Sequence, residues 1–246
     1  MSGIQGRVAI VTGAASGIGV AVAELFAERG AQVIGVDRAE SVHTAVAALP
    51  GDGHHAIVAD LTVPAAADAV AAEAVALAGR IDILVNSAGI VRLAPALDLS
   101  DADWDATLAV NLTAGYRMAR AAGRVMTEAG YGRIVTIASQ AALIALDEHV
   151  AYGASKAAIL GMTKVLAREW APRGVTVNAI SPTVVATPLG EQAWAGEKGE
   201  AMKALIPVGR FAQPREIAAL IAYLADDDAA MITGENVVID GGYSIV

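Results

Sequence analysis

Two residues four positions apart, Tyr152 and Lys156, have the side chains and the spacing needed for proton transfer. On a helix, side chains at this spacing lie on one face and touch each other. A phenol has a pKa of about 10, and an ammonium held beside it favours the phenolate and lowers that pKa toward neutrality. The same pair is also common on exposed helix faces, where it does no chemistry. The rest of the sequence must decide between these interpretations.

A serine stands thirteen residues before Tyr152, at the end of the strand-like run 134–138. The Ser139 hydroxyl is expected to reach the same substrate oxygen as Tyr152 and to hydrogen-bond it where charge develops. Gln140 follows directly, and His149 stands three residues before Tyr152. These two side chains are expected to bind substrate near the reacting oxygen. A capping or surface histidine is the alternative interpretation of His149.

A second kind of chemistry is indicated by the glycine-rich turn between the first strand and the first helix. Its glycines allow a tight turn and a close approach of the backbone to a pyrophosphate, whose charge meets unpaired N–H groups at the helix start. A turn that binds nothing is the alternative. The residues of the turn that we expect to contact a dinucleotide are Thr12, Gly13, Ser16, Gly17, Ile18 and Gly19.

Asp37 ends the second strand, eighteen residues beyond Gly19. A dinucleotide fold places an acid at about this distance, where it bonds the adenosine ribose hydroxyls. A carboxylate there repels a 2′-phosphate, so Asp37 favours NAD over NADP. The neighbouring Arg38 keeps NADP open, and a simple strand-end cap is the alternative role for Asp37.

Both sites need a scaffold that joins distant parts of the chain, and alternating strand-like and helical segments provide one. Strands are predicted at 7–11, 32–36, 56–59, 81–85, 134–138, 175–180 and 236–239, with helical patterns between them. This alternation predicts a single α/β domain spanning 1–246, with a Rossmann-type doubly wound parallel sheet of about seven strands and helices on both faces. Ligands bind beyond the carboxyl ends of such strands. The polar residues expected to converge there are Thr12, Asp37, Asp60, Asn86, Ser139 and Ser181.

Composition excludes several other classes of protein. A net charge of -9 and an isoelectric point near 4.9 argue against nucleic acid or an anionic membrane as partner. The chain has no cysteine, which excludes disulfides and thiolate metal sites and fits the cytoplasm. We expect no metal site, and the run Asp226–Asp228 is expected to be a solvated helix end. Neither a signal peptide nor a membrane span is expected.

Taken in order, these motifs resemble those of the short-chain dehydrogenase/reductase family, and the match runs from Arg7 to Gly242. The segments that carry the resemblance are Thr12-Gly13-x3-Gly17-x-Gly19, Asn86-Ser87-Ala88-Gly89, Asn111, Ser139 and Tyr152-x3-Lys156. The resemblance implies a Rossmann-type fold, a nicotinamide cofactor and a homotetramer. Two positions depart from the family pattern: Ser87 replaces a second Asn, and Thr183 replaces the Gly that usually follows the proline.

The resemblance also implies a role for each matched residue. Tyr152 would be the general acid/base, Ser139 would polarise the substrate oxygen, and Lys156 would bond the nicotinamide ribose and tune the phenol. Asn111 would hold a water that extends the proton relay, with a buried Asn that only bonds a neighbouring carbonyl as the alternative. Cofactor contacts are implied for Tyr152 and Lys156 and for Asp60, Leu61, Asn86, Ala88, Gly89, Ile180, Pro182 and Thr187.

The substrate side looks like the pocket of xylulose reductases and related polyol dehydrogenases, because Gln140 follows Ser139 and His149 precedes Tyr152 by three. Trp194, on the segment 188–206 that often forms a lid in this family, is expected to close over the substrate. A polyol needs several hydrogen-bonding partners. The sequence therefore predicts the NAD-dependent interconversion of a sugar alcohol and its ketose.

Two other functions stay open. A 3-oxoacyl-[acyl-carrier-protein] reductase usually needs NADP and a basic docking face, and Asp37 and the net charge argue against both. A local basic patch on one predicted helix could still dock an acidic carrier, and this patch consists of Arg117, Arg120 and Arg124. A dinucleotide-binding regulator without activity is the third candidate, and the retention of all three catalytic side chains argues against it.

Overall fold

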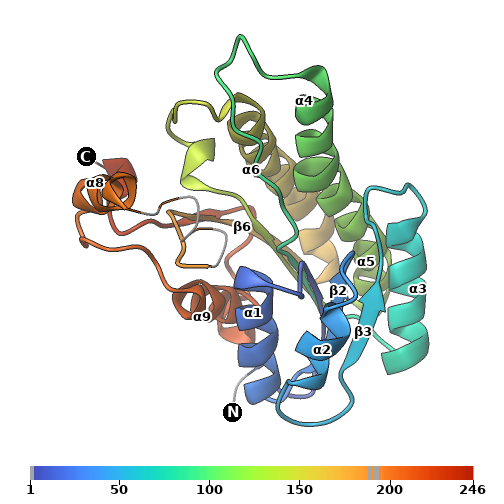
Figure 1. Ribbon diagram of the computed structural model, residues 1–246. Coiled ribbons are helices and arrows are strands. Elements are labelled where there is room, and N and C mark those ends of the chain that lie inside the picture. Colours follow the sequence, from blue (N-terminus) through green and yellow to red (C-terminus); the bar gives the residue numbers. More distant parts are fainter. Residues whose placement is uncertain (1–2, 188–189, 191–193, 195, 246) are drawn as a thin grey trace.

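Seven parallel strands form one sheet at the centre of the molecule (Figure 1). The computed structural model describes residues 3–187, 190, 194 and 196–245. The strand order is β3-β2-β1-β4-β5-β6-β7. The strands are β1 (Val8–Thr12), β2 (Gln32–Asp37), β3 (His55–Val58), β4 (Ile83–Asn86), β5 (Gly132–Ile137), β6 (Val175–Pro182) and β7 (Asn236–Ile239). The predicted doubly wound parallel sheet is confirmed, with strand positions close to those expected.

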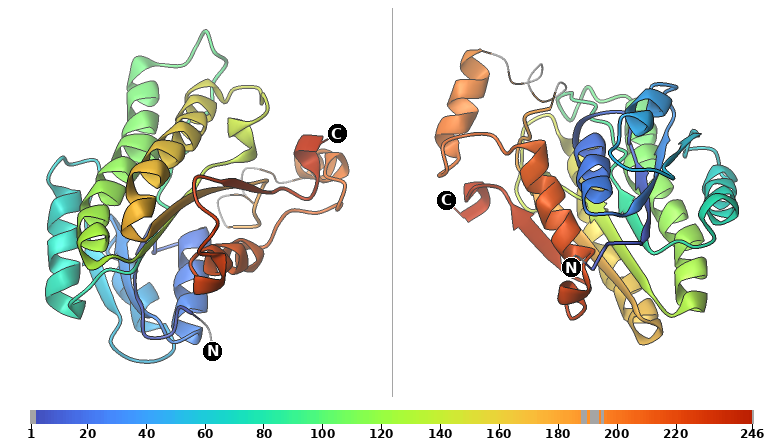
Figure 2. Two further views of the ribbon diagram at one scale, coloured as in Figure 1. Left: turned by 180° about the vertical axis from the view of Figure 1, so that it is seen from behind. Right: turned by 90° about the horizontal axis from the view of Figure 1, so that it is seen from below.

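Helices cover both faces of the sheet, as the two further views show (Figure 2). Helices α1 (Gly17–Glu28), α2 (Val42–Ala47) and α9 (Pro214–Leu224) pack on one face, and α3 (Ala66–Ala78), α5 (Gly115–Ala129) and α6 (Val150–Trp170) on the other. Helix α4 (Asp101–Leu108) runs through the π-helical turn η1 (Ala109–Ala114) into α5. The remaining pieces are α8 (Glu197–Leu205) and the short turns η2 (Gln140–Ala142), η3 (Ala171–Arg173), η4 (Asp227–Ala229) and η5 (Tyr243–Ile245).

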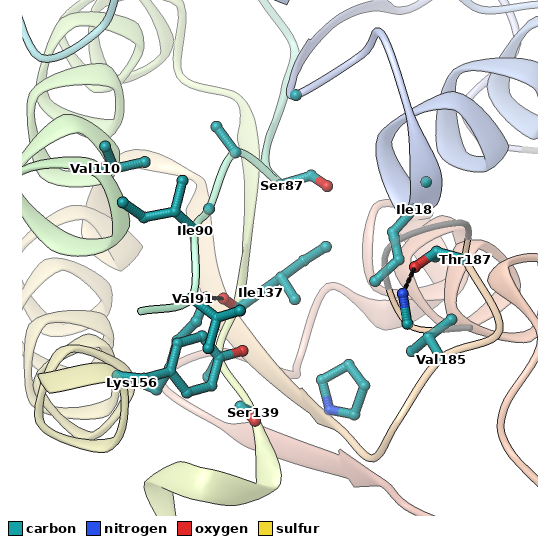
Figure 3. Close-up of a pocket in the computed structure, with 18 of the residues that line it drawn as sticks. Ile18, Ser87, Ile90, Val91, Val110, Ile137, Ser139, Lys156, Val185 and Thr187 are labelled. Carbon is teal, nitrogen blue, oxygen red and sulfur yellow. Dashed lines mark hydrogen bonds between the residues drawn. The ribbon is translucent and has the colours of Figure 1, made fainter. Parts of the chain in front are cut away.

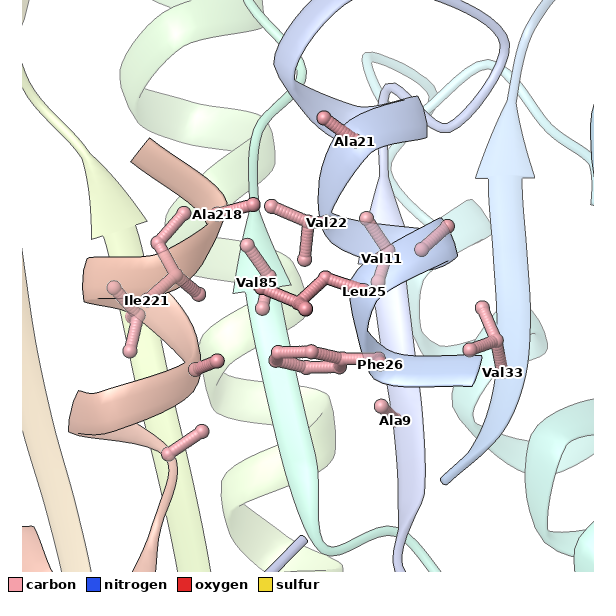
Figure 4. Close-up of a cluster of buried hydrophobic side chains, with 14 of the residues drawn as sticks. Ala9, Val11, Ala21, Val22, Leu25, Phe26, Val33, Val85, Ala218 and Ile221 are labelled. Atoms are coloured by element: carbon pink, nitrogen blue, oxygen red, sulfur yellow. The ribbon is translucent and has the colours of Figure 1, made fainter. Parts of the chain in front are cut away.

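The strands are buried on both faces, so successive side chains enter different cores. On β1, Ala9 and Val11 contact α1, whereas Val8 and Ile10 contact the opposite layer. Figure 4 shows the core on the α1 side of the sheet, where Phe26 of α1 packs between the sheet and α9. This packing holds α1 rigidly against the sheet, and with it the turn that precedes α1.

The amino-terminal edge of the sheet carries a cluster of charges, far along the strands from their carboxyl ends. The Tyr131 ring lies under the guanidinium of Arg7 at 3.8 Å and that of Arg133 at 4.3 Å. The Tyr131 hydroxyl donates to Asp227 at 2.9 Å, and burial raises the pKa of Tyr131 to about 12. Asp226 accepts from the backbone N–H of Gly3. Asp227 and Asp228 are exposed just after α9, as expected for a solvated helix end, and Asp226 and Asp227 in addition hold neighbouring segments in place.

The structure describes the predicted lid segment 188–206 only in part. Within it α8 begins at Glu197, and residues 188–189, 191–193 and 195 lie outside the described residues. In the described part of the chain, each helix is too short or too polar to cross a bilayer.

Candidate active site

The glycine-rich turn has the backbone geometry that a bound pyrophosphate requires. Gly13 and Gly17 have backbone φ angles of 71° and 58°, in a region that residues other than glycine rarely adopt. A Cβ on Gly13 would lie 3.0 Å from the Ala88 backbone, and one on Gly19 would overlap the Gly13 carbonyl. Because the first N–H groups of α1 have no acceptor within the helix, the turn presents donors to an anion.

Thr12 and Asn86, at the ends of β1 and β4, do not line the cavity beyond the strands. The Thr12 hydroxyl accepts from the N–H groups of Ser87 at 3.1 Å and Ala88 at 3.2 Å. The Asn86 amide donates to the Gly115 carbonyl at 3.1 Å and to the hydroxyl of Thr136 at 3.3 Å. Both side chains are buried: Thr12 ties the end of β1 to the segment after β4, and Asn86 ties β4 to β5 and α5.

The carboxylates that end β2 and β3 lie at the same edge of the sheet. Asp37 accepts from the N–H of Ala15 at 3.1 Å and from that of Ala39 at 3.0 Å, so it ties the glycine-rich turn to β2. Asp60 accepts from both the N–H and the hydroxyl of Thr62, and these bonds lower the pKa of Asp60. Both carboxylates line the large cavity.

A cavity of about 1440 Å³ opens beyond the carboxyl ends of the strands. Figure 3 shows one wall with Ser139 and Lys156 and the facing wall with Ile18 and Thr187. The predicted site residues that line the cavity are Gly13, Ser16, Gly17, Ile18, Asp37, Asp60, Leu61, Ala88, Gly89, Ser139, Gln140, His149, Tyr152, Lys156, Pro182, Thr187 and Trp194. Those that do not line it are Thr12, Gly19, Asn86, Asn111 and Ile180.

Tyr152 and Lys156 lie on the first turns of α6, and β5 ends just before Ser139. The Lys156 ammonium lies 5.5 Å from the centre of the Tyr152 ring and donates to the Ile137 carbonyl at 2.6 Å. Burial lowers the pKa of Lys156 to about 8. The predicted pairing on one helix face is therefore present, with the ammonium anchored to β5.

The expected lowering of the Tyr152 pKa is wrong. Burial raises the pKa of Tyr152, and a hydrogen bond with Ser139 opposes this rise only in part. Desolvation disfavours the phenolate more strongly than the neighbouring groups favour it. The Ser139 oxygen also accepts from the N–H of Ala141 at 3.2 Å, which fixes the position of the hydroxyl.

Asn111 lies in the π-helical turn η1, and both polar atoms of its side chain bond protein partners. Its oxygen accepts from the N–H of Ile90 at 2.8 Å, and its amide donates to the Ile90 carbonyl at 2.9 Å and to Ser155 at 3.1 Å. The Ser155 hydroxyl donates to the Tyr152 carbonyl at 2.7 Å. Asn111 thus bonds a neighbouring carbonyl and links the segment after β4 to the turn of α6 that carries Tyr152.

The residues predicted to contact the substrate all line the cavity: Gln140, His149 and Trp194. Gln140 is buried, and its side-chain oxygen has no partner in the described part of the chain. The His149 ring meets the Tyr152 ring edge-on, with 5.9 Å between the ring centres. Trp194 packs against Phe211 at 6.5 Å, so its ring already rests on the protein beside the cavity.

Three residues that sequence reasoning missed belong to this region. Ser155 lies inside the Tyr152–Lys156 motif, and its position between two site residues was the only available signal. Asp147 and Glu148 also line the cavity, directly before His149. Acidic residues in a loop are usually solvated, so nothing in the sequence marked them.

Comparison with known proteins agrees with this geometry. Residues 13–244 match the family model described as Enoyl-(Acyl carrier protein) reductase. The chain is 57% identical to D-threitol dehydrogenase of Mycolicibacterium smegmatis, covering 98% of this chain and 94% of that protein. The chain belongs to the short-chain dehydrogenase/reductase family. It is an oxidoreductase of that family that acts on alcohols with a pyridine nucleotide, which confirms the predicted resemblance.

Other members of the short-chain dehydrogenase/reductase family match over the same length. The NAD-dependent glycerol dehydrogenase of Listeria innocua is 52% identical, over 98% of this chain and 95% of that protein. A 3-oxoacyl-[acyl-carrier-protein] reductase of Vibrio cholerae is 39% identical, over 99% of both chains. A crystal structure from Beutenbergia cavernae, with NADP at low occupancy, has a TM-score of 0.92 and 40% identity over 98% of both chains.

Proposed function

We propose that this enzyme interconverts a polyol and its ketose, with NAD as the cofactor. The observation that carries the proposal is the convergence of Ser139, Tyr152 and Lys156 with Gln140 and His149 on one cavity. Three of these groups suit proton transfer at a carbinol oxygen, and the other two add polar contacts for further hydroxyls. The names of the relatives from Mycolicibacterium smegmatis and Listeria innocua support the same substrate class.

The cavity fits a dinucleotide together with a substrate. Its volume of about 1440 Å³ exceeds the 300–1,000 Å³ that is common for a single small ligand. At the start of α1, Gly13 and Gly17 have backbone conformations that residues with a Cβ rarely adopt, which supports a turn that comes close to a pyrophosphate. When bound, the nicotinamide accepts or returns the hydride. The residues proposed to hold the cofactor are those of the turn and strand ends that line the cavity.

The protein's own part in the reaction is to hold the substrate oxygen and to move one proton. Ser139 and Tyr152 hydrogen-bond the oxygen at which charge develops, and Tyr152 takes the hydroxyl proton during oxidation and returns it during reduction. Because burial raises the pKa of Tyr152, the phenol is a proton donor in the ligand-free protein. We propose that Lys156 supplies the positive charge that makes proton release possible once the site is filled.

Asp37 supports NAD over NADP. It ends β2, lines the cavity and already accepts two backbone N–H groups, so its carboxylate is held where a 2′-phosphate would meet a like charge. Arg38 also lines the cavity and is the feature that favours NADP. Activity measured with both cofactors on one polyol tests the assignment, and a clear preference for NADP would contradict it.

Reduction of a 3-oxoacyl-[acyl-carrier-protein] is the second candidate, supported by the 39% identical relative. The basic patch that would dock an acidic carrier is engaged within the protein. Arg117 donates to the Thr62 carbonyl at 2.8 Å, and Asp68 lies 3.9 Å from Arg120 and 3.4 Å from Arg124. These contacts weaken the patch as a docking surface and favour the polyol.

We further propose that the enzyme is a homotetramer in the cytoplasm and that α8 and Trp194 cover the substrate. Large apolar side chains such as Tyr116 on α5, Val165 on α6 and Val238 on β7 are exposed in the single chain, which supports burial between subunits. Light scattering of the purified protein measures the assembly state.

The deciding experiment is a panel of tetritols, pentitols and glycerol offered with NAD, followed by NADH absorbance at neutral and mildly alkaline pH. Turnover of at least one polyol, and weaker turnover of a 3-oxoacyl thioester with NADPH, is the expected result. NADH binding detected by fluorescence without turnover of any substrate would instead support a dinucleotide-binding regulator.

A further inference from the structure

Two residues that line the cavity carry a buried polar atom with no hydrogen-bond partner among the residues that the structure describes. These atoms are the side-chain oxygen of Gln140 and the hydroxyl of Thr183. Thr183 is only 7% exposed. A buried polar group without a partner is costly, and native proteins rarely keep one. Because both residues line a cavity, a ligand can supply the partner.

The hydroxyl of Thr183 differs from the two hydroxyls nearest to it along the chain. The Ser181 hydroxyl donates to the side chain of Asn236 at 2.8 Å, and the Thr187 hydroxyl accepts from the N–H of Gly190 at 3.1 Å. Thr183 stands where the family usually has glycine, but its φ is not positive, so this backbone does not require glycine. The hydroxyl is therefore an addition of this chain to the family pattern.

The regular pairing of β6 with β7 shows which face of the sheet Thr183 occupies. The N–H of Ala179 donates to the Glu235 carbonyl at 2.8 Å, and the N–H of Thr183 donates to the Ile239 carbonyl at 3.2 Å, so the pairing continues to Thr183. Every second side chain of a strand lies on the same face. Ala179 packs against Ile159 of α6. Thr183 therefore lies on the α6 face, and α6 also carries Tyr152.

Thr187 lies on a different side of the same cavity. A Cβ on Gly17 would lie 3.4 Å from the Thr187 methyl group, so Thr187 contacts the glycine-rich turn. Figure 3 shows Thr187 with Ile18 on the wall opposite Ser139 and Lys156. Thr187 is thus placed toward the cofactor turn, and Thr183 is placed toward the helix that carries the proposed proton donor.

The two atoms without a partner lie at the ends of neighbouring strands. Ile137 of β5 pairs with Ile180 of β6, and Gln140 and Thr183 each stand three residues further along the chain. The amide oxygen of Gln140 only accepts hydrogen bonds, whereas the hydroxyl of Thr183 can also donate. A ligand hydroxyl that donates to Gln140 and accepts from Thr183 satisfies both atoms at once. A carbonyl or carboxylate oxygen can satisfy Thr183 alone.

We infer that Thr183 is a specificity-determining residue, whose hydroxyl donates to a substrate hydroxyl other than the one that reacts. Gln140 is the acceptor for the same substrate hydroxyl. The inference rests on the proposed polyol activity, in which Ser139 and Tyr152 serve the reacting oxygen. It selects substrates with a further hydroxyl over monohydric alcohols.

The test compares the wild type with Thr183→Val and Thr183→Ser, using NAD and the polyol that the wild type turns over best. Thr183→Val keeps the shape of the side chain and should lower kcat/KM for the polyol by about tenfold, the loss expected for one uncharged hydrogen bond. Thr183→Ser keeps the hydroxyl and should recover most of this loss. On butan-2-ol, which has no second hydroxyl, Thr183→Val should equal the wild type.

Thr176→Val is the matched control. Thr176 lies on the same strand, is buried and has an unpartnered hydroxyl within the described part of the chain, but it does not line the cavity. This variant should keep the polyol kcat/KM of the wild type. Urea unfolding of the ligand-free protein should show both valine variants to be at least as stable as the wild type, because neither hydroxyl has a protein partner to lose.

Three outcomes would overturn the role of Thr183. They are an unchanged polyol kcat/KM in Thr183→Val, an equal loss on the polyol and on butan-2-ol, and a loss that appears as weaker NADH binding by fluorescence. If the wild type does not turn over butan-2-ol, the polyol decides: Ser well above Val supports the inference, and equal values overturn it. A wild type without activity on any polyol would instead refute the proposed function.

The shared hydroxyl has its own test in the double variant Thr183→Val, Gln140→Leu. If both side chains bond one substrate hydroxyl, the loss of polyol kcat/KM in the double variant should be smaller than the product of the two single losses. Losses that multiply would show that the two side chains act on separate groups, and would overturn the role of Gln140 as the second partner.

Discussion

Replacing Lys156 with Met should abolish activity and yet make the ligand-free protein more stable at pH 7. Burial lowers the pKa of Lys156 from 10.5 to about 8. At about 1.4 kcal/mol per pKa unit, this difference corresponds to about 3 kcal/mol of destabilisation while the ammonium is charged. Met removes that charge with little change in shape. It also removes the bond to the Ile137 carbonyl, which costs about 1–3 kcal/mol if no water replaces it. The net gain expected at pH 7 is about 1 kcal/mol.

The pH dependence separates these two contributions. A lysine with a lowered folded-state pKa destabilises the protein fully below that pKa, and the effect fades as pH rises from about 8 toward 10.5. The free energy of unfolding of the wild type should therefore rise relative to Lys156→Met by about 2 kcal/mol between pH 7 and pH 10. Urea unfolding at fixed protein concentration measures this difference at each pH.

Lys164→Met is the matched control, because Lys164 lies on the exposed face of the same helix. A difference between wild type and Lys156→Met that stays constant from pH 7 to pH 10 would refute the desolvation argument. A Lys156→Met protein that is less stable than the wild type at every pH would show that the bond to Ile137 outweighs burial of the charge.

Three further predictions concern single side chains of the site. Tyr152→Phe should remove turnover and leave NADH binding intact, measured by fluorescence; retained turnover would contradict the assigned proton donor. Asp37→Ala should lower the ratio of kcat/KM for NAD to kcat/KM for NADP by about tenfold or more, because the like-charge repulsion of a 2′-phosphate is relieved. Steady-state kinetics with both cofactors measures this ratio. An unchanged ratio would show that Asp37 only holds the turn. Ser155→Ala should lower the free energy of unfolding by about 1–2 kcal/mol in urea, because the Asn111 amide and the Tyr152 carbonyl each lose a partner; equal stability would contradict this linkage.

The sheet and the meeting of Ser139, Tyr152 and Lys156 at one cavity could be predicted from local patterns. Buried β-branched runs that end in polar residues mark parallel strands whether or not their neighbours are known, and β7 appears over the predicted residues Asn236–Ile239. The spacing of Tyr152 and Lys156 determines their common helix face. These features depend on residues close in sequence or on strand ends that the topology brings together.

Other features depend on burial and loop geometry, which the sequence does not display. Spacing predicts that Lys156 lies beside Tyr152, but only the fold shows that desolvation dominates and raises the Tyr152 pKa. The bonds of Asn111 to both backbone groups of Ile90 require a π-helical turn facing the segment after β4. The tautomer of His149 is set by a carbonyl two residues earlier, in a loop whose shape no pattern indicates.

The single hydroxyl of Thr12 restricts how the ends of β1 and β4 move relative to each other. Two successive amides, those of Ser87 and Ala88, share it as their acceptor. The end of β1 and the end of β4 should therefore open and close together as one unit, with or without a bound nucleotide. In hydrogen–deuterium exchange both amides should be slow to the same degree in the ligand-free protein, and Thr12→Val should quicken both together. Nucleotide entry then requires no joining of the two strand ends.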